Sequence, residues 1–241
     1  MMKQLAILCL LSNFCLTTFG QTNNNKGLAN TVTKNGANAN QKNYSKLKLI
    51  DQFNNILQKD TATMISKAQF SPIYIGFKKT EIKITYKPST LGNRAGKRGN
   101  HKKPDSKSMI ITVDTTKTVG SQMGVYETYT KAEYRDNKIA YPVFIENLSS
   151  DTLDIGFGNV FPIIMEAKDE DGSWKAIQKK FIYECGKGLS EFYLAPKQIA
   201  ITTMKQFEGT FKTKLRLVFS YSSIKVYSNE IDGFINRGQF K

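Results

Sequence analysis

The sequence predicts a mostly β protein, an antiparallel β-sandwich with one amphipathic helix near the N-terminus. Three observations support this fold class. About a dozen short β-prone runs follow residue 70 at close spacing, turn-forming residues separate them, and hardly any helical pattern comes between them. Strands joined by short turns pair antiparallel, whereas βαβ units need longer helical connections.

Residues 1–20 have the features of a secretory signal peptide. Lys3 gives a basic start, an apolar run follows over residues 5–11, and Thr18-Phe19-Gly20 supplies small residues before Gln21. The apolar run is too short to span a bilayer, and no later stretch is long and apolar enough for a transmembrane helix. We therefore expect export to the periplasm or the extracellular space, cleavage before Gln21, and no transmembrane segment in the mature chain.

Residues 21–44 are rich in Asn, Thr, Gly and Lys, and they predict a disordered linker that cannot bury enough surface to fold. Residues 45–69 change in character, because their apolar side chains recur at steps of three and four. This spacing predicts an amphipathic helix laid on the body, and a helix on an anionic membrane surface is the alternative. The apolar stripe consists of Leu49, Ile50, Phe53, Ile56, Leu57, Met64, Ile65 and Ala68.

Residues 70–241 form the predicted sandwich domain. Its core is expected at residues 139–177, where apolar residues recur at every second position, the period of strands with one buried face. These residues are Ile139, Tyr141, Val143 and Ile145, and then Leu153, Ile155 and Phe157. Turn formers at 147–151 and the Asp171-Gly172 pair predict a β-meander, with Trp174 covering one end of the core. Further strands are predicted at 73–77, 80–87, 109–114, 125–135, 181–183, 192–194, 199–202, 214–220 and 224–227, and a short helix over 179–184 is an open alternative.

Residues 141–235 resemble the immunoglobulin-like and fibronectin-type-III-like modules of secreted bacterial proteins. The resemblance is carried by the Asn147-Leu148-Ser149 turn, the Asp171–Trp174 hairpin, the 194–197 turn and the strand at 213–217. It implies an immunoglobulin-like sandwich, and a role in adhesion, carbohydrate contact or assembly. The cysteine pair of antibody-type domains is absent, which excludes a close relation to them.

The net charge of +15 is concentrated in the N-terminal part of the chain. Residues 91–107 contain six basic residues and one acidic residue, whereas residues 108–241 contain 17 basic and 16 acidic residues. Residues 88–107 predict an exposed, mobile loop, whose plain interpretation is a solvated connector. As a hypothesis, its basic residues form a polyanion site that contacts acidic polysaccharide, lipid head groups or another envelope component. The predicted site residues are Arg94, Lys97, Arg98, Lys102, Lys103 and Lys107.

The sequence contains no catalytic signature and predicts no cofactor or metal. His101 is the only histidine and lies in the basic loop, where no apolar neighbour is expected to fix its orientation. Neither a Cys185–His101 dyad nor a zinc site is therefore expected. Asp169-Glu170-Asp171-Gly172 lacks the closing Glu of a calcium loop and is typical of a turn. No aromatic residue interleaves with the basic residues, so specific nucleic-acid recognition is not predicted.

Cys9 and Cys15 leave with the signal peptide, so the mature chain keeps only Cys185. An intrachain disulfide is then excluded. The residue is expected to be a small buried hydrophobe, and a reactive thiol is the alternative.

These observations favour a secreted or periplasmic binding or scaffolding protein without enzyme activity, with a protein partner as an open alternative. The competing hypothesis is an envelope hydrolase whose catalytic carboxylates the sequence does not mark. A cleft lined by two or more acids would favour the hydrolase. A flat sheet face with exposed aromatic residues would favour binding.

Overall fold

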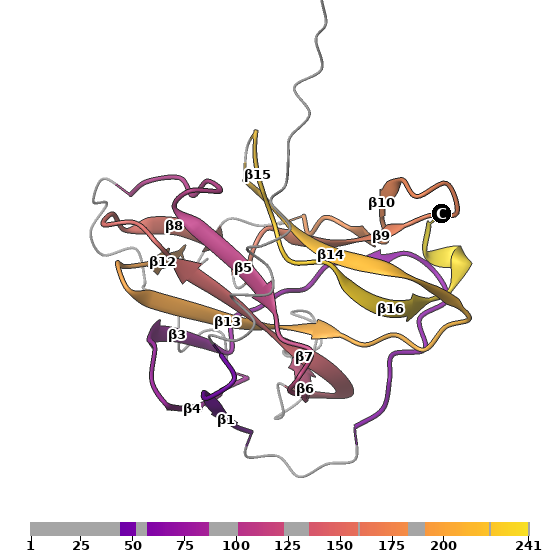
Figure 1. The fold of residues 1–241 in the computed structure, drawn as a ribbon, viewed down its shortest axis with the longest axis horizontal. Coiled ribbons are helices and arrows are strands. Elements are labelled where there is room, and N and C mark those ends of the chain that lie inside the picture. Colours follow the sequence, from indigo (N-terminus) through magenta and orange to yellow (C-terminus); the bar gives the residue numbers. More distant parts are fainter. Residues whose placement is uncertain are drawn as a thin grey trace, which may run out of the picture. The chain divides into compact units, whose positions relative to one another are not determined.

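The computed structural model describes residues 44–51, 57–86, 101–122, 135–158, 160–182, 191–221 and 223–240, and the fold is mostly β with several antiparallel sheets (Figure 1). The predicted signal peptide, most of the linker, the strand predicted at 125–135 apart from Arg135, and Cys185 lie outside these residues. Within them, the only helical element is the short 3-10 turn η3 (Arg237–Phe240).

One five-stranded sheet is centred on β7 (Arg135–Asn147). β13 (Gln198–Lys205) pairs with one edge of β7, and β5 (Met109–Val113) and β6 (Val119–Gln122) pair with the other. β3 (Tyr74–Phe77) completes the order β3-β13-β7-β5, and every pairing is antiparallel. The predicted strands at 73–77, 109–114 and 199–202 are confirmed as β3, β5 and the middle of β13.

A second five-stranded sheet is centred on β14 (Phe211–Tyr221). Its order is β10-β9-β14-β15, with β16 (Ile231–Ile235) also paired to β14. β9 (Ile163–Lys168) and β10 (Trp174–Ala176) form a hairpin, and β15 (Ile224–Tyr227) pairs with the end of β14. The predicted strands at 214–220 and 224–227 are confirmed.

The Asp171-Gly172 hairpin is also confirmed. Gly172 has a φ of 76°, and the Asp169 carboxylate accepts hydrogen bonds from the backbone N–H groups of Asp171 and Ser173. The turn thus combines a left-handed glycine with an Asx cap.

Three two-stranded ladders complete the described strands. β8 (Leu153–Phe157) pairs antiparallel with β12 (Glu191–Leu194), which confirms the predicted strand at 192–194. β1 (Lys48–Ile50) pairs parallel with β4 (Glu81–Lys83), and β2 (Ser66–Lys67) pairs parallel with β11 (Gln178–Lys179). Residues 180–182 are neither strand nor helix, so the strand predicted at 181–183 and the helix over 179–184 are wrong in their described parts.

The predicted β-meander is wrong at its first turn, because β7 and β8 do not pair with each other. The chain passes from the β7 sheet to the β8–β12 ladder through a corner at residues 147–151. Asn147 holds this corner: its Nδ2 donates to the carbonyl oxygens of Asp151 and Leu194, at 2.7 and 2.8 Å, and its Oδ1 accepts from the Ser149 N–H and hydroxyl. The side chain therefore replaces the backbone pairing that a hairpin would provide.

The predicted helix at 45–69 is also wrong in the described residues, since Lys48–Ile50 and Ser66–Lys67 are strands and no helix forms between 57 and 69. Backbone groups that are distant in the sequence provide the hydrogen-bond partners of this segment instead. The Asp60 N–H donates to Gln206, and the Ala68 N–H donates to Lys179. Tertiary pairing has overridden the local three-to-four spacing, because a helix needs packing as well as periodicity to be stable.

The apolar residues form two core clusters, one on each face of the β7 sheet. Val143 and Ile145 of β7 belong to the larger cluster, which also takes residues from the β14 sheet and the β8–β12 ladder. Phe144 belongs to the smaller cluster, together with Ile73 and Ile82. The prediction that β7 buries one face is therefore wrong, because the segment before residue 87 covers its other face. Tyr44, predicted to lie in the linker, is 1% exposed and stacks on Phe144 at 4.0 Å between ring centroids.

Candidate functional site

The C-terminal part of the predicted basic loop is fixed against β8. The Lys102 N–H donates to the Thr152 carbonyl, and the Asp154 N–H donates to the Lys102 carbonyl, both at 3.0 Å. The Lys102 ammonium lies 3.4 Å from the Asp151 carboxylate. Arg94, Lys97 and Arg98 lie outside the described residues, so the structure places three of the six predicted site residues.

A tight turn orders the rest of this segment. The Asp105 carboxylate accepts hydrogen bonds from the N–H groups of Lys107 and Ser108 and from the Ser108 hydroxyl. These bonds, led by the Ser108 hydroxyl, lower the pKa of Asp105 from its ordinary value. Backbone pairing with residues 152–154 and this turn thus fix the path of residues 102–108.

Lys103 and Lys107 are both exposed. Neither lies within ion-pair distance of a carboxylate in the described part of the chain. Lys103 lies over the Tyr221 ring, 5.9 Å from its centroid.

A polar cluster lies beside this segment on β8, β12 and the end of β14. Two tyrosine–carboxylate pairs form it: the Tyr221 hydroxyl donates to Asp154 at 2.7 Å, and the Tyr193 hydroxyl donates to Glu191. The His101 ring lies 3.9 Å from the Tyr193 ring, centroid to centroid. We call these five residues the tyrosine cluster.

Burial and the neighbouring carboxylates raise the pKa of both tyrosines in the cluster to about 12. Desolvation is the larger cause in each case, followed by the hydrogen bond to the paired carboxylate. Both hydroxyls are donors in these bonds. Each carboxylate is therefore already engaged by a neutral hydroxyl, an arrangement that stabilises the position of the tyrosine ring.

His101 was expected to lie in a loop without an apolar neighbour, and this expectation is wrong. Its ring packs on Tyr193, and both of its nitrogens are buried without a hydrogen-bond partner among the described residues. Sequence alone gave no signal for this contact, because Tyr193 lies far along the chain on β12.

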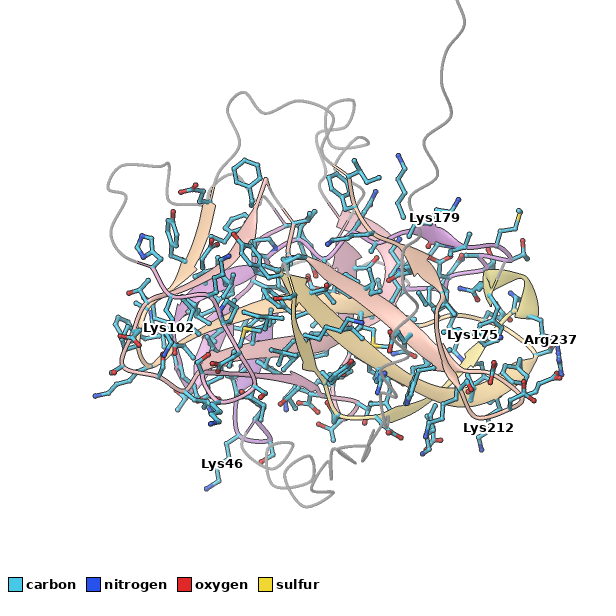
Figure 2. The ribbon with its side chains drawn as sticks, turned by 90° about the horizontal axis from the view of Figure 1, so that it is seen from above. Lys46, Lys102, Lys175, Lys179, Lys212 and Arg237 are labelled. Carbon is cyan, nitrogen blue, oxygen red and sulfur yellow. The ribbon has the colours of Figure 1, made fainter. Side chains whose placement is uncertain are left out.

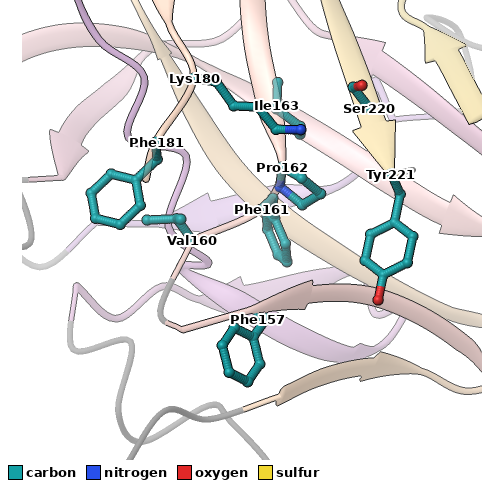
Figure 3. Close-up of a pocket in the computed structure, with 9 residues that line it drawn as sticks. All are labelled: Phe157, Val160, Phe161, Pro162, Ile163, Lys180, Phe181, Ser220 and Tyr221. Atoms are coloured by element: carbon teal, nitrogen blue, oxygen red, sulfur yellow. The ribbon is translucent and has the colours of Figure 1, made fainter. Parts of the chain in front are cut away.

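An apolar pocket of about 220 Å³ adjoins the cluster, and Tyr221 lines both (Figure 3). Phe161, Val160 and Ile163 supply buried apolar walls, and Phe157 at the rim is 39% exposed. Figure 3 shows Phe181 and Val160 on one side of the pocket and Ser220 and Tyr221 on the other. The alternating pattern assigned Phe157 to a buried strand face and did not indicate this pocket, because residues 157–163 meet residues 180–181 and 220–221 only in the folded chain.

Trp174 does not cover the core as expected, since it lies outside both core clusters. In the β9–β10 register it stands opposite Lys168, on the face away from the buried Ala167. The Arg216 guanidinium lies 4.1 Å from the Trp174 ring centroid and also 2.7 Å from a Glu166 carboxylate oxygen. Tyr227 contacts the same guanidinium, at 4.3 Å from its ring centroid. The Arg216 guanidinium thus has two aromatic rings and one carboxylate as partners, all on one face of the β14 sheet.

Charged side chains are distributed widely over the described surface. In Figure 2, Lys175, Lys212 and Arg237 lie toward one end of the ribbon, whereas Lys102 lies toward the other end. Several of the basic residues are ion-paired, as in Lys175–Asp169 and Lys214–Asp232 at 2.8 Å each. No cluster of three or more potential metal ligands occurs in the part of the chain that the structure describes.

Two further findings complete the description of the site. Over the described ranges, no helix is long and apolar enough to cross a membrane. No family model matches the chain, and no curated protein or solved structure matches it significantly. The site must therefore be interpreted from its own residues and geometry.

Proposed function

We propose that the protein is an exported, non-enzymatic binding protein that contacts an anionic component of the cell envelope. The contact is made by Arg94, Lys97, Arg98, Lys102, Lys103 and Lys107. The observation that carries the proposal is the charge of residues 94–107, six basic residues against Asp105 alone. A local excess of one sign attracts polyanions without requiring a shaped pocket.

The described end of this segment supports the proposal. The bonds between Lys102 and β8 fix the backbone at residues 102–107, while Lys103 and Lys107 remain exposed. A fixed backbone with exposed ammonium groups loses less conformational entropy on binding than a free chain would. The segment thus has a rigid base from which its charge reaches solvent.

We also propose that the two five-stranded sheets form an immunoglobulin-like sandwich. Support comes from the shared core, because Val143 of β7 and Leu217 of β14 belong to one apolar cluster. Sandwiches of this type present loops at their ends, where binding residues are commonly placed. The basic segment precedes β5 and would be such a loop.

Titration with heparin, acidic lipid vesicles and duplex DNA tests the binding proposal. Engaging four to six phosphates of a duplex should give a log–log salt slope of about −4 to −5, so binding should be strong at low salt and nearly lost above physiological salt. Changing the six residues to Ser should abolish binding at low salt. Affinity should depend little on polymer identity, because charge is recognised and shape is not.

A matched control removes the same charge elsewhere. It changes six exposed lysines to Ser: Lys46, Lys59, Lys79, Lys83, Lys212 and Lys225. This variant should keep most of the parent's affinity. Equal loss in both variants would show that net charge alone drives binding, and unchanged binding after removal of the six site residues would contradict the proposal.

A further inference from the structure

The apolar pocket beside Tyr221 has the size and the lining of a small-molecule site. Its volume of about 220 Å³ exceeds the roughly 150 Å³ at which an apolar cavity takes up benzene. Phe161 and Val160 are buried in its wall, and Phe157 at the rim stays partly exposed. A short aliphatic chain or a single ring therefore fits the space, and its transfer from water would be favourable.

One basic side chain lines this pocket. Lys180 is the single charged side chain among the nine described residues that line it. Its side chain is exposed, and it makes no ion pair with a carboxylate in the described ranges. Lys180, Pro162 and Ile163 line the same pocket, and in the view of Figure 3 the Lys180 side chain extends toward the other two.

The charges around the pocket favour one orientation for a ligand. On the Tyr221 side, Asp154 accepts the Tyr221 hydroxyl and Glu191 lies in the same cluster, which would repel an anion. Lys180 comes from the other side, between β11 and Phe181. An anionic group is therefore stabilised at Lys180 and disfavoured near Asp154.

We propose that the pocket binds an anionic amphiphile, with a short acyl chain between the aromatic walls and its carboxylate beside Lys180. In apolar pockets, a small number of polar groups usually fixes the orientation of a small ligand. This inference goes beyond the binding of a polyanion and uses none of the six residues assigned to it. Either proposal can fail without affecting the other.

Calorimetric titration of the full chain with octanoate and with octanamide tests the proposal. The two probes have the same chain length and differ in charge. Octanoate should bind with a Kd on the order of 1 mM or tighter, as ligand size and apolar contact allow. Lys180→Gln should weaken octanoate about two- to fivefold, the range of an exposed ion pair, and leave octanamide unchanged. Lys179→Gln is the matched control, because this neighbouring exposed lysine does not line the pocket.

A second pair of variants tests the apolar part of the site. Ser220→Leu places a larger side chain in the pocket and should weaken both probes about tenfold or more by occupying their space. Phe157→Ser removes an exposed rim residue and should weaken both probes with little effect on folding, so it replaces Ser220→Leu if that variant does not fold. Circular dichroism spectra that match the parent's would verify the folded state.

Three results would overturn the proposal. The first is no measurable heat with octanoate at concentrations well above its expected Kd. The second is identical octanoate affinity in the parent and in Lys180→Gln. The third is unchanged binding in folded Ser220→Leu or Phe157→Ser, which would place the probe elsewhere on the protein.

Discussion

Tyr193 and Tyr221 hold their protons more tightly than ordinary tyrosines because each is partly desolvated and donates to a carboxylate. The pKa of each is raised to about 12, against an ordinary value of 10.0. Between these values the unfolded chain releases the two protons and the folded chain keeps them. The contribution of these two groups to the free energy of unfolding is therefore fully present below pH 10 and is lost as the pH rises toward 12.

An alkaline titration followed by ultraviolet absorbance checks this prediction. In the folded protein a fraction of the tyrosines should ionise only near pH 12, whereas in guanidinium all should ionise near pH 10. Tyr221→Phe should remove one late-ionising group and leave those of Tyr193 and of Tyr44, whose pKa is also raised by burial. A folded protein that ionises completely around pH 10 would contradict the hydrogen bonds to Asp154 and Glu191.

The corner between β7 and β8 depends on one amide side chain. Asn147 is buried, and its Nδ2 satisfies the Leu194 carbonyl on β12 as well as the Asp151 carbonyl in the corner. The residue therefore joins the five-stranded β7 sheet to the β8–β12 ladder. A corner of this kind replaces a backbone hairpin with side-chain hydrogen bonds, so its stability is concentrated at one position.

Asn147→Ala should destabilise the protein by about 2–4 kcal/mol, because it removes the bonds donated to the Asp151 and Leu194 carbonyls and those accepted from Ser149. Ser149→Ala is the control, since it removes a single hydroxyl from the same corner and should cost about 1 kcal/mol or less. Denaturant unfolding of the three proteins gives the difference. Equal stability of Asn147→Ala and the parent would show that the corner is held by other contacts.

Many strand positions after residue 70 were predictable from local pattern, whereas strand partners were not. The strand predicted at 214–220 lies within β14, where the alternating Leu215, Leu217 and Phe219 are all buried. No local pattern indicates that β2 pairs with β11, or that β8 pairs with β12 and not with β7. Pairing is decided by the burial that the whole sheet achieves, which a window of ten residues does not contain.

The same limit explains the errors at the N-terminal segment and at the candidate site. The spacing of Leu49, Ile50 and Ala68 fits a helix, yet the structure uses these residues in strands and bridges against distant backbone. Charge could be predicted, because it is a property of composition. The tyrosine cluster and the pocket could not, because His101, Tyr193 and Tyr221 meet only after three separate elements have packed.

At the scale of the whole molecule, the proposed role requires export. Thr18-Phe19-Gly20 satisfies the small-residue rule for cleavage, so mass spectrometry of the secreted protein should find Gln21 as its first residue. Gly20→Leu replaces a small residue at the cleavage site and should leave the signal attached. An intact Met1 in the mature protein would contradict the export proposal.

The distance between partners along the chain affects how the protein can fold during its synthesis. β3 and β7 lie on opposite sides of β13, so neither has its full set of neighbours until the ribosome has translated residues 198–205. A nascent chain that stops before β13 leaves Ile73 and Phe144 without Ile199 and Ile201, which share their apolar cluster. The residues before β13 therefore cannot complete this sheet while they emerge from the ribosome. The strands made earlier reach their final pairing only when residues 198–205 are available.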